Sequence, residues 1–165
     1  MTERSSSPIL DLLVVFVGVF ALQFLVGLVD TVTGLFVLSA PLQENPCTVV
    51  TSVYAHANTG HLISTAVALV LFGYAVADAT TRLRFHLFFL VTGMVSGVAE
   101  IVLSDFLAKS PVVSDVVGFV PVVDVAATGG VLGASGAVFA LLGYLLASNR
   151  LVAGLGAVAD VPGWV

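Results

Sequence analysis

Four long apolar runs and the beginning of a fifth alternate with short polar segments along the chain. The runs cover residues 9–29, 61–77, 85–103, 135–147 and 151–165. Their apolar residues are continuous instead of alternating, which indicates helices, and a helix needs about 20 such residues to cross about 30 Å of hydrocarbon. The last run is too short to cross and is interrupted by Asp160, Pro162 and Gly163. The pattern predicts an all-α membrane protein with four transmembrane helices plus a partial fifth.

Glycines interrupt the start of the fourth apolar run, at positions 129, 130, 133 and 136. They disfavour a regular helix before Ser135. A helix over residues 135–147 is about 20 Å long at about 1.5 Å per residue, so we expect Ser135 at its N-terminus, about 10 Å below one membrane surface. The irregular backbone before it must then be buried in protein or line a water-filled cavity.

The serine at this helix start has two interpretations. A hydroxyl beside free amide donors in a wet cavity is a candidate nucleophile. Alternatively, Ser135 only caps the helix, next to a face of small residues that packs on another helix. That face consists of Gly136, Ala140, Gly143 and Ala147.

Composition narrows the class of protein. The chain of 165 residues is 59% hydrophobic and 9% charged, whereas water-soluble domains carry about 25% charged residues. The net charge of −5 argues against nucleic acid as a partner. The single cysteine, Cys47, excludes an internal disulfide and a cysteine metal cluster. We therefore expect an integral membrane protein, in contact with the lipid bilayer and without a cofactor.

The basic residues predict the orientation of the chain. With alternating spans, four of the five fall on one side of the membrane: Arg4, Arg82, Arg84 and Arg150. Only Lys109 falls on the other side. Basic loops remain in the cytoplasm, which predicts a cytoplasmic N-terminus in the plasma membrane. His56, His61 and Ser135 then lie toward the outer face, and His86 lies near the cytoplasmic end of its span.

Polar residues inside and between the spans give further expectations. Asp11 and Gln23 interrupt the first span and should face the protein interior. Residues 105–128 are rich in Val, Pro and Gly and show no helical period. This connection is long and apolar, so we expect it to pack on the membrane or on the protein.

Two histidines mark the outer end of the second span. His56 and His61 stand five residues apart, and Thr65 follows His61 by four, so His61 and Thr65 share one helical face. A packed interfacial histidine is one interpretation of His61. Its predicted depth matches that of Ser135, which favours a shared site instead. No metal site is expected, because the two histidines lack a third ligand at suitable spacing.

Two motifs resemble those of a known family, the rhomboid intramembrane serine proteases. The fourth run is similar to the GxSGxxxA signature of this family, and the start of the second run is similar to its HxxxxHLxxN signature. The residues that carry the resemblance are Gly133, Ser135, Gly136 and Ala140, and His56, His61 and Leu62. The order of loops and spans also agrees, over about residues 35–147.

The resemblance implies a rhomboid-like helical bundle that cleaves transmembrane protein substrates near the outer leaflet. Ser135 would be the nucleophile. His61 and the Ser135 backbone amide would stabilise the oxyanion of the tetrahedral intermediate. His56 would order the outer end of the second span by packing, and Gly133 and Gly136 would allow close backbone approach.

The chain departs from the family pattern at two points. Thr65 stands where the family has asparagine, so the oxyanion site is expected to be weaker. The family's general base is a histidine on a sixth span, and the three histidines here include none in that place. We therefore expect residues 1–165 to form a single rhomboid-like domain truncated at its C-terminus. Without a sixth span, the small-residue face of the fourth helix should remain exposed to lipid or be covered only loosely by residues 151–165.

Three functional hypotheses follow. The chain is a fragment of an active intramembrane protease, or it is a natural truncation that binds transmembrane segments as an inactive pseudoprotease. The third hypothesis is a small-residue helix bundle with a structural role only. A histidine in a glycine-rich sixth span would favour the first, because a serine hydroxyl without a base is a poor nucleophile.

Overall fold

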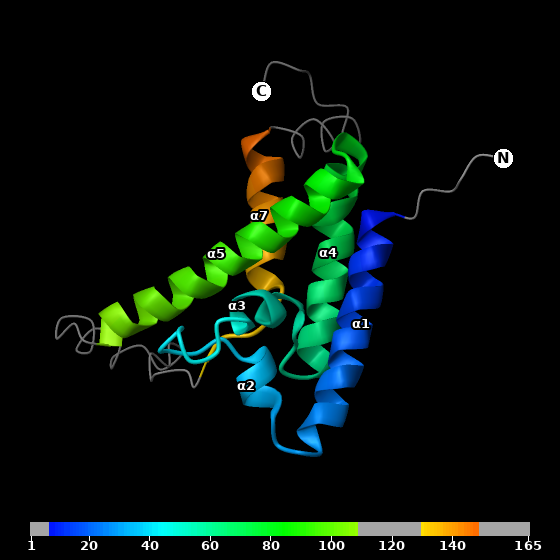
Figure 1. Ribbon diagram of the computed structural model, residues 1–165. Helices are drawn as coiled ribbons and strands as arrows, with labels where there is room; N and C mark the ends of the chain where they lie inside the picture. The colour runs from blue at the N-terminus through cyan, green and yellow to red at the C-terminus, as the bar shows by residue number, and fades with distance from the viewer. Residues whose placement is uncertain (1–6, 109–129, 149–165) are drawn as a thin grey trace, which may run out of the picture.

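The computed structural model describes residues 7–108 and 130–148, and these residues are helical for most of their length (Figure 1). The elements are α1 (Pro8–Gly27), α2 (Val32–Phe36), α3 (Thr48–Thr51), the 3-10 turn η1 (Ser52–Tyr54), α4 (Thr59–Ala79), α5 (Arg82–Ala108) and α7 (Ser135–Ala147). Within the described residues the backbone forms one isolated β-bridge and no strand. The predicted all-α class is confirmed.

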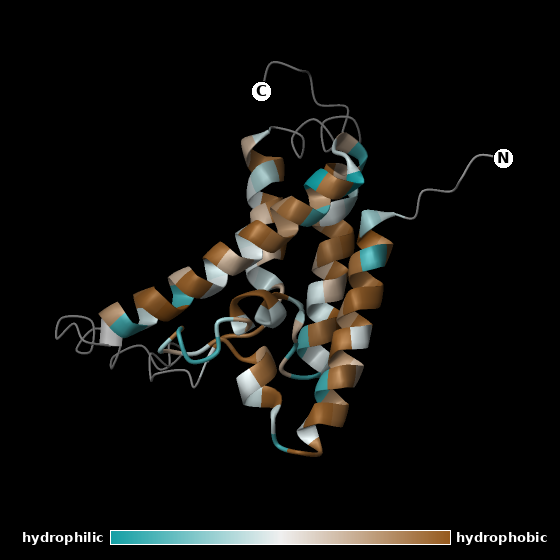
Figure 2. Ribbon diagram, in the orientation of Figure 1, coloured by the Kyte–Doolittle hydropathy of each residue, from teal (hydrophilic) through white to brown (hydrophobic). Residues whose placement is uncertain are grey.

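Three of the helices are long and apolar enough to cross a membrane, namely α1, α4 and α5 up to Phe106. The helix α7 is a shorter apolar helix. Large apolar side chains lie on the outside, for example Phe24, Leu71 and Phe106, and hydrophobic residues make up most of the long helices (Figure 2). Exposing such an apolar surface to water is unfavourable in free energy, whereas exposing it to lipid is not. The chain is an integral membrane protein.

The helix α7 lies at the centre of the packing. It contacts both α5 and α4, and α4 in turn contacts α1 (Figure 1). The helix α5 crosses the others obliquely, and its C-terminal half extends away from the bundle. The buried core includes three phenylalanines, Phe16, Phe85 and Phe89, from α1 and α5. Leu141 of α7 is also fully buried in this core.

The predicted spans agree with the helices, with one correction. The fourth span has the predicted bounds, and the first two differ by one or two residues at each end. The third helix continues to Ala108, so residues 105–108 are helical and do not belong to the connection. Asp105 does not stop the helix, because a charged residue is tolerated near a helix end. The rest of the connection and residues 151–165 lie outside the described residues.

The small-residue face of α7 is filled at one end, which corrects the expectation that it is empty throughout. A Cβ added to Gly136 would overlap the side chain of Ser96 on α5 and would lie 2.5 Å from the Ser96 Cβ. Among the described residues, no atom lies within 4 Å of a Cβ added to Gly143, and Ala147 is exposed. The partner of Gly136 is thus α5, within the described part of the chain.

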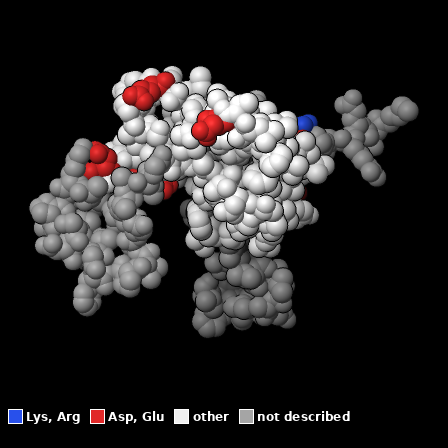
Figure 3. Space-filling view, turned by 90° about the horizontal axis from the view of Figure 1, so that it is seen from below, with Lys and Arg blue, Asp and Glu red and all other residues white. Residues whose placement is uncertain are grey.

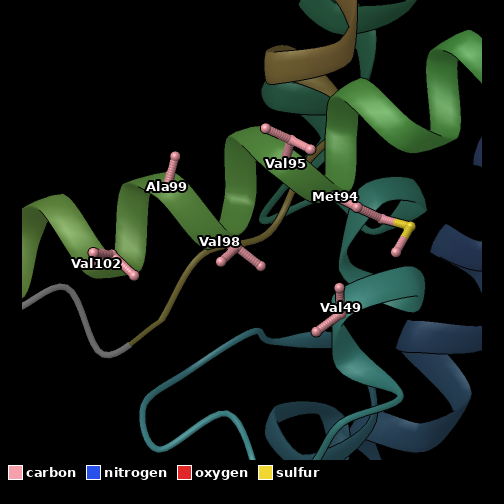
Figure 4. A pocket seen from close by; sticks show the side chains of 6 residues that line it. All are labelled: Val49, Met94, Val95, Val98, Ala99 and Val102. Atoms are coloured by element: carbon pink, nitrogen blue, oxygen red, sulfur yellow. The ribbon is translucent and has the colours of Figure 1, made fainter.

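A shallow apolar groove lies between α3 and the projecting half of α5 (Figure 4). Its lining residues are Val49, Met94, Val95, Val98, Ala99 and Val102. None of these side chains carries a nucleophile or a titratable group, so the groove can contact hydrocarbon but offers no catalytic side chain.

Seen from the end of the molecule that carries α2, the surface holds few charged side chains, in separate places (Figure 3).

Candidate active site

The backbone before α7 is irregular, as predicted, and it is held by other parts of the protein. Val131 and Leu38 form an antiparallel bridge with N–H···O distances of 2.9 and 2.7 Å. The Gly133 N–H donates to the Ser52 carbonyl at 2.8 Å. Gly133 has φ +132°, a conformation that glycine adopts without strain. These contacts place Ser135, which is exposed, at the first residue of α7.

His61 faces this turn from the first turn of α4. Asn58 caps α4 by accepting the His61 backbone N–H at 2.9 Å. A Cβ added to Gly133 would lie 2.5 Å from His61 Cε1 and 2.8 Å from Nε2, compared with 3.7 Å from Nδ1. The Cε1–Nε2 edge of the ring therefore packs directly on Gly133, two residues before Ser135. Any side chain at position 133 would displace this ring.

A long hydrogen bond on the other side of the ring favours one tautomer of His61. The Ala57 N–H donates to His61 Nδ1 in a long bond of 3.5 Å. A neutral imidazole that accepts at Nδ1 carries its proton on Nε2. The assigned tautomer thus presents an N–H donor on the edge of His61 that faces the Gly133–Ser135 turn.

His56 lies behind His61, away from the turn. Its side chain is 1% exposed, and its ring meets the His61 ring edge to face with centroids 5.3 Å apart. The Phe16 ring contacts it at 4.8 Å from α1. Neither ring nitrogen of His56 has a hydrogen-bond partner among the described residues. His56 is thus packed between the rings of Phe16 and His61, and the supporting role that the resemblance implies for it stays a prediction.

The surroundings of His56 keep its ring neutral. Burial, and secondarily the charge that His61 can carry, lower the pKa of His56 from 6.5 to about 4. Below pH 6.5 the unfolded chain binds a proton at this residue, whereas the folded chain binds it only near pH 4. The unfolded state therefore holds more protons in this interval, and stability falls as the pH is lowered.

We expect the free energy of unfolding to decrease from pH 6.5 to pH 4 and to gain nothing further from His56 above pH 6.5. Steric-trap or SDS unfolding across this range in one detergent measures the decrease. The variant His56→Phe keeps a buried ring and removes the proton site, so its stability should depend less on pH. Equal slopes for the two proteins would contradict the assignment.

The remaining candidates separate into two groups. Thr65 lies one turn after His61 on α4 and is 4% exposed, on the side of the helix that faces protein.

His86 lies in another part of the molecule, with its Nε2 3.1 Å from Asp11 Oδ2. The same Asp11 oxygen also accepts a hydrogen bond from Arg82 Nε at 2.7 Å. Asp11 precedes Gln23 by 12 positions, about 18 Å along α1. The structure thus keeps His86 away from Ser135, as predicted.

Gln23 contacts the site region, although the sequence only indicated that it faces protein. Its Nε2 donates to the His56 carbonyl at 3.3 Å, and its Oε1 accepts the His56 N–H at 2.9 Å. The sequence held no signal that would link it to His56, because the two residues stand 33 positions apart. Phe16, which contacts the His56 ring, lies seven residues before Gln23 on the same face of α1.

Comparison with known proteins assigns the family. The family model for the Rhomboid domain matches residues 43–155. The same comparisons return no significant match to a curated protein sequence or to a solved structure. The matched stretch includes α4, α5 and α7 and both motifs, whereas α1 lies before it. With more than half of its length matched, this chain belongs to the rhomboid family.

Proposed function

We propose that the protein is an intramembrane serine endopeptidase of rhomboid type, which cleaves transmembrane substrates near the outer leaflet. It would lie in the plasma membrane with a cytoplasmic N-terminus, as the basic residues predict. The observation that carries the proposal is the packing of the His61 Nε2 edge on Gly133, two residues before Ser135. Rhomboid family membership supports the same chemistry.

In this proposal Ser135 Oγ attacks the carbonyl carbon of the scissile peptide bond. The negative charge that develops on the carbonyl oxygen would be stabilised by His61 Nε2–H and by the Ser135 backbone N–H. Backbone N–H groups in the first turn of a helix lack intrahelical acceptors, and the helix dipole favours an anion there. Each such donor typically contributes about 10²–10³ in rate.

The mechanism also requires a general base. It takes the Ser135 proton during attack and returns it to the leaving amine. None of the three histidines takes this role in the proposal. His86 pairs with Asp11, His56 is buried with a lowered pKa, and His61 acts as a donor. The family pattern assigns the base to a sixth-span histidine.

A pseudoprotease that binds transmembrane segments without cutting them is the second candidate function. One observation favours it, because Thr65 stands where the family has asparagine.

Fluorophosphonate labelling distinguishes the two functions. We expect no appreciable labelling of the 165-residue chain in detergent, because none of its three histidines acts as the base in this proposal. The extended chain, defined as this sequence with a completed fifth span and a histidine-bearing sixth span, should be labelled. Labelling should disappear in Ser135→Ala and slow about 10²-fold in His61→Ala.

Two results would overturn parts of this proposal. A folded extended chain that is not labelled would favour the pseudoprotease. Robust labelling of the 165-residue chain, lost in Ser135→Ala, would mean that His56 or His61 acts as the base.

A further inference from the structure

The helix α1 lies before the part of the chain that matches the family, yet it contacts the region of the candidate site. Along its 20 residues it carries two strongly polar side chains, Asp11 and Gln23. Asp11 is paired with Arg82 at the opposite end of the helix. Gln23 is 7% exposed and points to the segment before α4.

The Gln23 carboxamide binds both backbone groups of one residue. It donates to the His56 carbonyl at 3.3 Å and accepts the His56 N–H at 2.9 Å. A carboxamide inside an apolar helix is unfavourable unless it is hydrogen-bonded, and so is a buried backbone N–H or carbonyl. These two bonds satisfy four polar groups and fix the His56 backbone relative to α1.

The position of the His56 backbone determines what contacts His61. The next residue, Ala57, supplies the N–H that donates to His61 Nδ1. Asn58, one residue further, caps α4 at the His61 backbone N–H. The His56 ring itself packs on the His61 ring. A shift of residues 56–58 would therefore weaken the hydrogen bond from the Ala57 N–H to His61 Nδ1, which favours the Nε2–H tautomer of His61.

We propose that Gln23 is a positioning residue for the candidate site. By holding the His56 backbone, it keeps the Ala57 N–H on His61 Nδ1 and the Nε2–H edge of His61 against the Gly133–Ser135 turn. Its effect on catalysis rests on the proposed protease function, whereas its effect on the His61 ring does not. A residue that contributed stability alone would leave the tautomer of His61 unchanged in the folded protein.

The ring nitrogens of His61 report this effect directly. The chain has three histidines, so ¹⁵N-histidine labelling gives a spectrum simple enough to assign by single His→Gln variants. In the wild-type protein at pH 7.5 we expect the Nε2–H tautomer at His61. The variant Gln23→Met keeps the length of the side chain and removes both hydrogen bonds, and it should give a mixture of the two tautomers.

Two further variants make the test decisive. Leu22→Met places the same side chain one position away, on the exposed face of α1, and it should give the wild-type spectrum. Gln23→Asn withdraws the carboxamide by about 1.5 Å, beyond hydrogen-bond reach, in case Gln23→Met does not fold. A wild-type His61 spectrum in either folded Gln23 variant would overturn the proposal, and so would an equal change in Leu22→Met.

Chemical modification gives a second readout that does not need activity. Diethylpyrocarbonate reacts with accessible neutral imidazoles, so the buried His56 should react slowly. In Gln23→Met its rate should rise about tenfold, which corresponds to about 1.4 kcal/mol, within the range for a lost buried hydrogen bond. The rate at His86 should not change. Equal acceleration at both histidines would indicate general loosening and contradict a positioning role.

Activity tests the catalytic consequence separately. In the extended chain, Gln23→Met should lower kcat for a transmembrane substrate about tenfold and change KM little, because the oxyanion donor acts in the transition state. If the extended chain is inactive but the His61 tautomer changes, the protease function fails and the positioning role remains. If the chain is active and neither kcat nor the tautomer changes, the positioning role fails.

Discussion

Gly133→Ala is expected to lower the rate of the proposed Ser135 reaction in the extended chain at least about 100-fold. A Cβ at this position would lie 2.5 Å from His61 Cε1 and 2.8 Å from Nε2. The ring would have to move, and a displacement of about 1 Å in a catalytic group can cost about 10² in rate. The φ of +132° adds backbone strain for any residue other than glycine. Fluorophosphonate labelling and cleavage of a transmembrane substrate both measure the loss.

The control for this variant is Gly18→Ala on α1, where an added Cβ meets no atom of residues 7–108 and 130–148 within 4 Å. Gly18→Ala should retain the wild-type rate. If Gly133→Ala reacted within a few-fold of the wild type, the contact between His61 and the turn would have no part in catalysis. The His61 ¹⁵N spectrum shows independently whether the ring has moved.

Gly136→Ala is expected to destabilise the protein by about 1–3 kcal/mol, the usual cost of an overpacked contact. Its new Cβ would lie 2.5 Å from the Ser96 Cβ. A rotation of the serine hydroxyl cannot relieve this overlap, because the Cβ is fixed to the α5 backbone. The helices α5 and α7 must therefore separate and lose contacts along their shared surface. Steric-trap unfolding of the 165-residue chain in one detergent measures the change.

Gly143→Ala provides the matched control on the same helix. No atom of the described part of the chain lies within 4 Å of a Cβ added here, and alanine is a better helix former than glycine by up to about 1 kcal/mol. We therefore expect Gly143→Ala to be neutral or stabilising. Similar losses in the two variants would mean that backbone effects, and not the contact with Ser96, determine the cost.

The sequence predicted the helices well because the signals for them are local. Continuous apolar runs of sufficient length define α1, α4 and α5, and the glycines at positions 129, 130 and 133 confine the start of α7 to Ser135. The same local signals placed His61 and Ser135 at one end of the molecule and His86 at the other. The structure agrees, with His61 on Gly133 and His86 on Asp11. The catalytic roles of Ser135, His61 and Thr65 stay predictions.

Other features depended on the tertiary structure. The sequence placed residues 105–108 in a connection, whereas α5 continues through them. It treated the small residues of α7 as one face, whereas Ser96 packs on Gly136 and leaves Gly143 open. Both outcomes depend on where α5 crosses α7, and no pattern within either segment specifies that crossing.

The contact between Gln23 and His56 shows most clearly which features the sequence determines and which only the tertiary structure decides. The sequence determined that an amide within an apolar span needs a polar partner. It did not determine which partner, because the two residues are 33 positions apart. Only the packing of α1 against the segment before α4 brings the carboxamide to the His56 backbone. Hydrogen bonds and close contacts act over a few ångströms, so their partners are decided by the fold and not by the order of residues along the chain.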